Sequence, residues 1–199
     1  VTVEDTTPPS ISPHAAVNAI AAGNAGANVT YTDPTASDLV DGARPVSCTP
    51  ASGTWFNAGA NTVTCKSKDT RNNEATSTFQ VNVTFAFGGF FSPVDNLPTV
   101  NVVNAGQAIP VKFSLGGNQG MAIFAAGYPK VVVMACAGTL TDTIEETVTA
   151  GNSSLSYDTG TARYNYVWKT DKAWASTCRQ LQLKFIDGST QTANFNFKK

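Results

Sequence analysis

Strict alternation of apolar and polar side chains near the middle of the chain most constrains what it can fold into. Phe79, Val81, Val83 and Phe85 are each separated by one polar residue. A period of two residues is that of a β-strand with one buried and one solvated face. An amphipathic helix would repeat at about 3.6 residues. The segment therefore predicts a half-buried antiparallel sheet.

Five short segments of the first half predict strands with turns between them. They are residues 17–20, 28–32, 44–48, 61–66 and 77–85. The intervening segments are rich in Gly, Asn and Asp, which tolerate positive φ or bond to their own backbone. Short strands with frequent turns are typical of a β-sandwich.

The second half shows the same alternation in residues 111–115, 181–185 and 195–198. Asp187-Gly188 lies between two of these strands and predicts a hairpin. Residues 131–135 are apolar throughout, which predicts a central strand. Met121 to Ala126 predicts one helical turn.

Charge and hydropathy narrow the range of partners. The 199 residues carry a net charge of -1, only 14% of them are charged, and the longest basic cluster is Lys198-Lys199. Globular domains average about 25% charged residues. Nucleic acid and anionic membranes are therefore not expected partners. No apolar run reaches the roughly 18 residues of a membrane span, so membrane insertion is not expected.

Two of the four cysteines lie in each half of the chain, and we expect Cys48 to pair with Cys65 and Cys136 with Cys178. Four cysteines allow three connectivities, and this is the one that needs no cross-domain bond. Disulfides persist in oxidising surroundings, which predicts an extracellular or surface location. The alternative is four reduced core cysteines. Zinc is not expected, because the chain has no CxxC spacing and a single histidine, His14.

The region around the first cysteine pair resembles the hyalin-repeat (HYR) module, an immunoglobulin-like adhesion module. The matching residues are Cys48, Pro50, Ser52, Gly53, Phe56, Gly59, Val63, Cys65, Asp69 and Asn73. Asn72 stands where the family pattern has Gly, and Asn also visits the left-handed region. In tandem arrays of such modules V-x-V ends one repeat, so Val1 to Val3 resembles the end of an upstream module.

The remainder resembles the C-terminal PxKF module of bacterial or phage extracellular proteins. Pro110, Lys112 and Phe113 carry the motif, and the match extends over most of residues 88–199. The two resemblances and the strand pattern together predict an all-β chain of two antiparallel β-sandwich (immunoglobulin-like) domains in series. We expect the first domain at residues 1–86, a Gly/Pro/aromatic linker at 87–98, and the second domain at 99–199.

No constellation of residues indicates catalysis. A Ser-His-Asp triad or a two-histidine metal site would have to be built around His14 alone. Glu145 and Glu146 are adjacent on a predicted strand and so point to opposite faces. We therefore expect no enzyme and no catalytic residue.

Two kinds of ligand site remain open. Asp33, Asp38 and Asp41 place hard oxygen ligands in one loop, as Ca²⁺ requires, and Glu4 and Asp5 could complete such a site in a tandem array. The alternative is that these aspartates only form turns. Trp55 and Trp174 lie in turn-rich segments and could stack on sugar rings of surface glycans. The alternative is that they pack in the core.

The sequence therefore predicts a non-enzymatic extracellular structural or adhesive protein of a surface layer, filament or virion-exposed assembly. Its partners would be proteins, through self-assembly or contact with neighbouring β modules. The alternative is a carbohydrate- or Ca²⁺-dependent binding module of a larger secreted protein.

Overall fold

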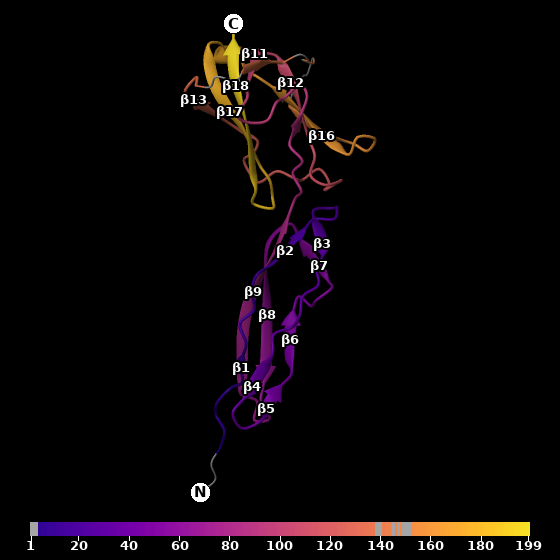
Figure 1. Ribbon diagram of the computed structural model, residues 1–199, viewed down its shortest axis with the longest axis vertical. Helices are drawn as coiled ribbons and strands as arrows, with labels where there is room; N and C mark the ends of the chain where they lie inside the picture. The colour runs from indigo at the N-terminus through magenta and orange to yellow at the C-terminus, as the bar shows by residue number, and fades with distance from the viewer. Residues whose placement is uncertain (1–3, 138–140, 145, 147, 149–152) are drawn as a thin grey trace. The chain divides into compact units, whose positions relative to one another are not determined.

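The computed structural model describes residues 4–137, 141–144, 146, 148 and 153–199, and it confirms an all-β fold (Figure 1). The chain forms two compact units. The first comprises residues up to Ile20 together with Gly26–Thr84, and the second comprises Ala21–Ala25 with Phe85–Lys199. The predicted domain boundary remains a prediction, and residues 90 and 91 of the predicted linker pair with a strand of the second unit.

The first unit is built from short strands and one long hairpin. Its strands are β1 (Ser10–Ile11), β2 (Val17–Ile20), β3 (Gly26–Asn28), β4 (Ala36–Asp38), β5 (Gly42–Arg44), β6 (Val46–Thr49), β7 (Trp55–Asn57), β8 (Gly59–Lys68) and β9 (Glu74–Thr84). They form sheets in the orders β2-β9-β8-β6, β1-β4-β5 and β3-β7. The alternating segment that predicted a strand begins within β9 and ends at Phe85, one residue after the strand.

The turn between β8 and β9 is held by one side chain. Oδ1 of Asp69 accepts hydrogen bonds from the backbone N–H groups of Arg71 and Asn73, both at 2.8 Å. Asn72 has a φ of 70°, the left-handed conformation that Asn tolerates in place of Gly. Asp69 therefore sets the register of the longest hairpin in the described first unit.

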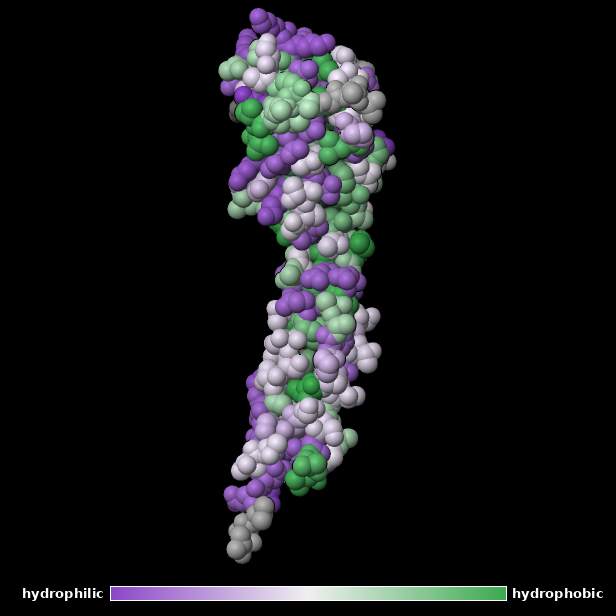
Figure 2. Space-filling view, turned by 60° about the vertical axis from the view of Figure 1, so that its left-hand side comes forward, coloured by the Kyte–Doolittle hydropathy of each residue, from purple (hydrophilic) through white to green (hydrophobic). Residues whose placement is uncertain are grey.

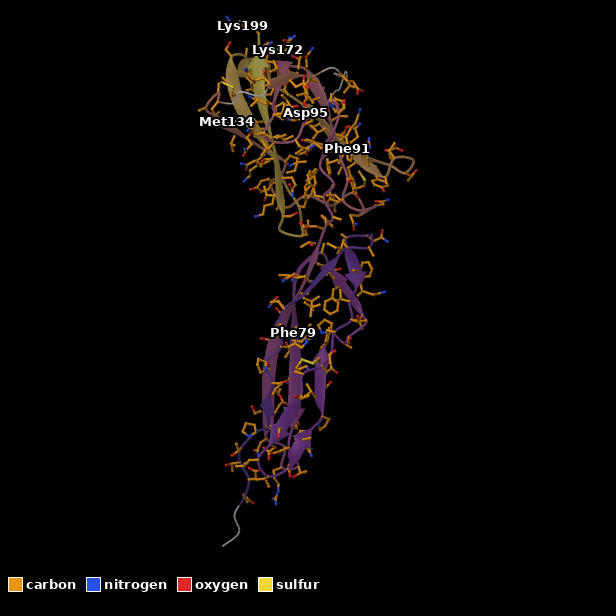
Figure 3. The ribbon with its side chains drawn as sticks, in the orientation of Figure 1. Phe79, Phe91, Asp95, Met134, Lys172 and Lys199 are labelled. Carbon is orange, nitrogen blue, oxygen red and sulfur yellow. A yellow bond between two sulfur atoms is a disulfide. The ribbon has the colours of Figure 1, made fainter. Side chains whose placement is uncertain are left out.

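The interior of the first unit is lined mainly by valines. Val63, Val81 and Val83 are fully buried. Phe79, labelled in Figure 3, stacks on the ring of His14 with centroids 4.0 Å apart and meets Tyr31 edge-on at 5.0 Å. These contacts follow from the alternation of β9, which points its odd-numbered residues inward.

The second unit is a sandwich of two larger sheets. Its elements are β10 (Phe90–Phe91), β11 (Val100–Asn104), β12 (Ala108–Phe113), β13 (Lys130–Met134), β14 (Thr141–Thr143), β15 (Ser154–Asp158), β16 (Arg163–Lys169), the 3₁₀ turn η1 (Lys172–Trp174), β17 (Thr177–Lys184) and β18 (Thr190–Lys198). The sheet orders are β10-β12-β16-β15 and β13-β17-β18-β11-β14.

Aromatic rings from both sheets fill the space between them. Trp168 of β16 meets Phe195 of β18 edge-on with centroids 5.0 Å apart. Phe113 of β12 stacks on Tyr164 at 5.5 Å and lies 5.6 Å from Phe185. The predicted Asp187-Gly188 hairpin is present, with Gly188 at a φ of 88°.

The structure departs from the prediction of purely antiparallel sheets at three pairs. β2 pairs with β9, and β11 pairs with both β18 and β14, in parallel. Parallel neighbours require a long crossover connection, and here most of each unit lies between the partners β2 and β9 or β11 and β18. Alternation within a strand does not encode this direction.

Two local predictions were wrong. The apolar segment at residues 131–135 is not a central strand, because β13 lies at the edge of its sheet with Val132 39% and Val133 69% exposed. Met121 to Ala126 forms no helical turn, and Phe124 instead makes an isolated bridge to Phe185. In the described part of the chain, no helix is long and apolar enough to cross a membrane.

Candidate functional site

Three aspartates from distant parts of the sequence meet in the first unit. Asp5 precedes β1, Asp38 ends β4 and Asp69 follows β8, and one carboxylate oxygen of each lies within 4.8 Å of the others. Asp38 is 6% and Asp69 4% exposed, and Asp5 is partly buried. We call these three residues the acidic cluster.

Hydrogen bonds position each member of the acidic cluster. Oδ1 of Asp38 accepts from the backbone N–H groups of Val40 and Asp41 at 2.8 and 2.9 Å. Oδ1 of Asp5 accepts from the N–H of Thr7 at 3.0 Å. Oδ2 of Asp5 and Oδ2 of Asp38 are both buried and have no hydrogen-bond partner among the described residues.

Asn73 links two members of the cluster. Its Nδ2 donates to the backbone oxygen of Asp5 at 3.0 Å and to Oδ2 of Asp69 at 2.6 Å. Burial raises the pKa of the Asp69 carboxyl, but the hydrogen bonds from Asn73 and from the N–H of Arg71 prevail and leave that pKa below its ordinary value. Asp69 is therefore held as a carboxylate.

Of the predicted loop ligands Asp33, Asp38 and Asp41, Asp38 alone lies in the acidic cluster. Asp33 is exposed, and Asp41 turns its carboxylate to the backbone N–H and hydroxyl of Thr70 at 2.6 and 3.0 Å. That N–H hydrogen bond is the main cause of the lowered pKa of Asp41. The alternative interpretation, that aspartates form turns, also describes Asp38 and Asp69. The carboxylate of each accepts a hydrogen bond from a backbone N–H group two or three residues later in the chain.

Sequence reasoning placed Asp5 as a ligand only within a tandem array, and it did not consider Asp69 as a ligand. The spacing of the aspartates could not reveal the acidic cluster, because its members lie in three separate segments. The available signals were the turn-forming residues Asp69-Thr70-Arg71-Asn72-Asn73 and the Asp5 that stands three residues before Pro8-Pro9.

Exposed apolar side chains lie beside the acidic cluster. Leu39 and Val40, in the turn between β4 and β5, are 96% and 70% exposed. Figure 2 shows strongly hydrophobic surface at the lower end of the first unit. A cavity of about 330 Å³ next to this turn is lined by Glu4, Asp5, Val40, Asp41, Thr70 and Arg71.

The two tryptophans predicted to meet glycans have different surroundings. Trp55 is 46% exposed, its ring lies against the backbone of Gly26, and its Nε1 donates to Oδ1 of Asn57 at 3.1 Å. Trp174 is half-buried against Phe197, with ring centroids 5.5 Å apart. Trp55 thus has the more accessible ring.

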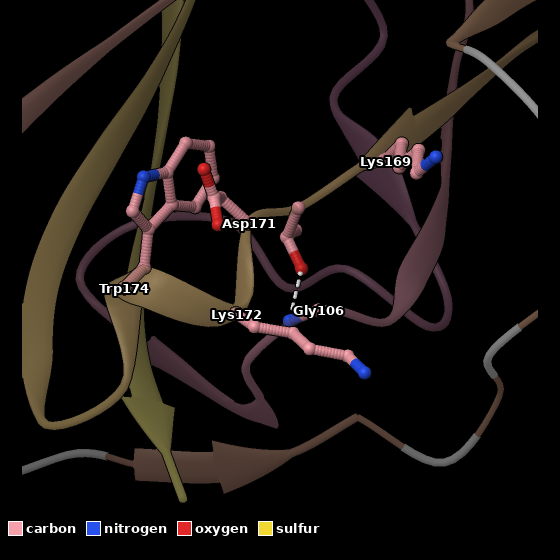
Figure 4. Close-up of a pocket in the computed structure, with 6 residues that line it drawn as sticks. Gly106, Lys169, Asp171, Lys172 and Trp174 are labelled. Atoms are coloured by element: carbon pink, nitrogen blue, oxygen red, sulfur yellow. Dashed lines mark hydrogen bonds between the residues drawn. The ribbon is translucent and has the colours of Figure 1, made fainter.

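Trp174 borders a cavity of about 540 Å³ in the second unit. Gly106, Lys169, Thr170, Asp171 and Lys172 also line it (Figure 4). The guanidinium of Arg179 lies over the indole ring, 4.7 Å from its centroid. The cavity therefore combines one aromatic edge with polar and charged groups.

The imidazole ring of His14 is held by contacts with neighbouring residues. Its Nδ1 lies 2.6 Å from the backbone oxygen of Ala15, and its Nε2 lies 2.9 Å from that of Thr32. With both ring nitrogens directed at carbonyl oxygens and the ring stacked on Phe79, His14 has a packing role in the described structure.

Both predicted disulfides are present. Cys48 and Cys65 occupy directly paired positions on β6 and β8. Cys136 is bonded to Cys178 at the start of β17. No cysteine is free, which fits an oxidising, extracellular compartment.

The family match among known proteins lies in the first half of the chain. The HYR domain family matches residues 4–83, which confirms that part of the predicted resemblance. Over 107 residues, 53% of this chain, the sequence is 35% identical to Hyalin of Strongylocentrotus purpuratus, and the match spans 8% of the length of Hyalin. The HYR match indicates a non-enzymatic, adhesion-type module.

Among solved structures, the tandem Ig repeats of Dlar align with 96% of this chain and 98% of that chain, at 10% sequence identity and a TM-score of 0.27. The PxKF resemblance of the second half and a bacterial or phage source stay predictions.

Proposed function

We propose that this chain is an extracellular, non-enzymatic structural or adhesive protein that joins other protein modules, including copies of itself, in a surface layer, filament or virion-exposed assembly. The edge strand β13 is the observation that carries this proposal. The HYR match over residues 4–83 supports the adhesive role, and the two disulfides support the location.

Strand β13 has the features of an edge that accepts a further strand. In the described chain it pairs with β17 on one side only. Natural edge strands are usually protected by charge, proline or a bulge. Here the centre of the strand is Val131-Val132-Val133, with Val133 69% exposed. Lys130 lies at one end of the strand, and Met134, which Figure 3 labels, lies at the other.

Backbone pairing to β13 would satisfy its outward N–H and C=O groups and cover its valines together. This mode of binding takes affinity from the backbone and specificity from alternate side chains. The proposed partner is therefore an extended strand of another β module.

The test is the association state of the purified full chain. Analytical ultracentrifugation over a wide concentration range should show reversible self-association, and electron microscopy at high concentration should show filaments or a lattice. Val133→Lys places a charge on the edge and should shift association to at least tenfold higher concentration, which corresponds to about 1.4 kcal/mol.

Leu39→Lys is the control, because Leu39 is an apolar residue of the other unit that is even more exposed, at 96% against 69% for Val133. It should leave association through β13 unchanged. A chain that stays monomeric at all concentrations and salt strengths contradicts self-assembly, and equal effects of the two substitutions contradict the role of β13.

Glycan binding is a second candidate function, favoured by the cavity of about 540 Å³ beside Trp174. Binding to a glycan array that is lost in Trp174→Ala but retained in Trp55→Ala would support that cavity as the site. Loss in Trp55→Ala alone would place glycan binding on the first unit.

A further inference from the structure

The acidic cluster contains buried charge that the fold leaves without a partner. Oδ2 of Asp38 lies in a side chain that is 6% exposed, and no described residue donates a hydrogen bond to it. Oδ2 of Asp5 is in the same state. Buried carboxylate oxygens normally have hydrogen bonds, a counter-charge or a metal ion.

No counter-charge among the described residues fills this role. The ion pairs found in the described part of the chain join Lys66 and Lys68 to Glu74, and Lys112 to Glu146. The positive charges of Arg44 and Arg71 act on Asp41, which lies outside the acidic cluster. One oxygen from each of three carboxylates thus lies within 4.8 Å of the others, without a cation from the described residues.

We propose that the acidic cluster binds one Ca²⁺ ion through Asp5, Asp38 and Asp69. A ligand set made only of carboxylate oxygens suits a hard cation and lacks the nitrogen and sulfur that zinc prefers. Ca²⁺ accepts oxygens at about 2.3–2.6 Å, so two oxygens within 4.8 Å of each other can share one ion. Backbone oxygens and water complete its six to eight ligands in such sites.

The hydrogen bonds of the cluster leave one oxygen of Asp5 and one of Asp38 available to an ion, while both oxygens of Asp69 also accept hydrogen bonds within the turn. Backbone N–H groups hold Oδ1 of Asp38 and of Asp5, and the Oδ2 atom of each remains. Binding would replace mutual repulsion of the carboxylates with attraction to a shared charge of +2. Rigid ligands that are already positioned lose little conformational freedom on binding.

Binding would join three segments of the first unit: the residues ahead of β1, the end of β4 and the turn between β8 and β9. The segment ahead of β1 already contacts the β8–β9 turn through the hydrogen bond from Asn73 to the backbone oxygen of Asp5. The ion would therefore order the chain where it enters the first unit. This inference does not rest on the proposed role of β13.

The test uses the full chain after removal of divalent ions with EGTA. Isothermal titration with CaCl₂ should show one site, with Kd in the range of about 10⁻⁴–10⁻³ M that is typical of extracellular modules. At tenfold excess over Kd, the calorimetric transition of the first unit should rise by roughly 5–10 °C. Hydrogen exchange at the amides of Thr7, Val40 and Asp41 should slow.

Asp38→Asn keeps the shape of the side chain and removes its charge. It should abolish the Ca²⁺-induced rise, and its metal-free transition should lie at or above that of the metal-free wild type, because repulsion is relieved. Asp5→Asn, in a segment outside the strands, should weaken Ca²⁺ binding at least tenfold and provides a second test should Asp38→Asn fail to fold. Asp33→Asn, an exposed aspartate outside the cluster, should respond as the wild type does.

The proposal is overturned if the wild type binds no Ca²⁺ at about 10 mM, tenfold above the weakest expected Kd. It is also overturned if Asp38→Asn or Asp5→Asn keeps the full response. A purely structural role of Asp38 predicts a different pattern, in which Asp38→Asn is less stable than the wild type and Ca²⁺ stabilises neither.

Discussion

The first unit fills its interior with valines and a few rings, whereas the second unit joins its two sheets through a network of aromatic rings. Among the largest fully buried side chains of the described residues, Phe56 and Val63 belong to the first unit. The others belong to the second: Tyr164, Phe113, Phe185, Phe195, Phe197, Ile109, Leu115, Ile123, Leu181 and Leu183.

This difference implies different sources of stability. Burying a large apolar side chain contributes about 1.5–3 kcal/mol, so the second unit gains most of its stability from buried area. The first unit has less such area and relies more on local constraints. These are the Cys48–Cys65 disulfide and the turn held by Asp69.

The largest expected effect is the loss of a ring from the second unit. Phe113→Ala removes a fully buried ring that contacts Tyr164 and Phe185, and should lower the free energy of unfolding of this unit by about 3–5 kcal/mol. Calorimetry or guanidinium unfolding should show this in one of two transitions. Phe79→Ala in the first unit is the matched variant and should cost less, because Phe79 is 6% exposed. Equal losses of unfolding free energy in the two variants would contradict the view that the second unit depends more on buried rings.

Removal of each disulfide gives the next effect. Replacing Cys48 and Cys65 by Ala should lower the stability of the first unit by about 3 kcal/mol, from the loop-closure entropy of a separation of 17 residues. Replacing Cys136 and Cys178 opens a separation of 42 residues and should cost the second unit about 4 kcal/mol.

The melting temperatures should nevertheless fall in the opposite order, because a given free energy shifts the transition of a smaller domain further. Scanning calorimetry of both double variants, with the intact chain as the reference, measures this. A larger fall for the second unit would show that the first unit does not depend on its disulfide in the way argued above.

Sequence patterns predicted the strands of both units better than they predicted where those strands lie. Alternation located β9, β12, β17 and β18, because burial of one face leaves a period of two in the sequence. The apolar segment at residues 131–135 was misassigned to a sheet centre. A strand of apolar residues can have both faces covered within its own sheet, or it can have one face that contacts a partner. The sequence pattern is the same in both situations.

The acidic cluster shows why candidate sites are harder to predict than strands. Asp38 was predicted as a ligand from its neighbours in sequence, whereas the structure brings it to Asp5 and Asp69. Those contacts depend on the pairing of β4 with β1 and on the end of the β8–β9 hairpin. The spacing of residues along the sequence does not predict which distant strands pair.

A smaller effect is expected where Trp55 covers Gly26. A Cβ built at Gly26 would overlap the indole ring of Trp55 and the backbone oxygen of Phe56. Gly26→Ala should therefore displace the ring and destabilise the first unit by about 1–3 kcal/mol, the usual cost of overpacking. Gly53→Ala is not a suitable control because of its φ of 81°, so Ala43→Ser on exposed β5 serves instead.

Calorimetry of Gly26→Ala should show a lower first transition and an unchanged second one. Trp55 fluorescence, isolated in a background where Trp168 and Trp174 are replaced by Phe, should shift to longer wavelength. An unchanged spectrum and stability would mean that Trp55 is not packed on the backbone as described.

The smallest expected effect compares two carboxylates whose pKa values are lowered by different means. In the first unit, hydrogen bonds from Lys66 and Lys68 are the main cause of the lowered pKa of Glu74. In the second unit, the hydroxyl of Thr161 and the N–H of Gly160 lower the pKa of Asp158. A folded-state pKa below the unfolded value adds stability above the unfolded pKa, and that stability is lost as the pH falls through the folded pKa.

Both units should therefore lose stability as the pH falls from about 5, where unfolded carboxylates begin to protonate, but salt should distinguish them. Ion pairs at the surface are screened by salt, whereas the Asp158 bonds come from neutral donors. NMR titration at low and high NaCl should show the pKa of Glu74 returning toward its ordinary value, while that of Asp158 moves little. Glu74→Gln should remove the salt-dependent part of the acid response of the first unit alone. An equal response of the two pKa values to salt would contradict this comparison. It would mean that the pKa of Glu74 does not depend on charged partners more than the pKa of Asp158 does.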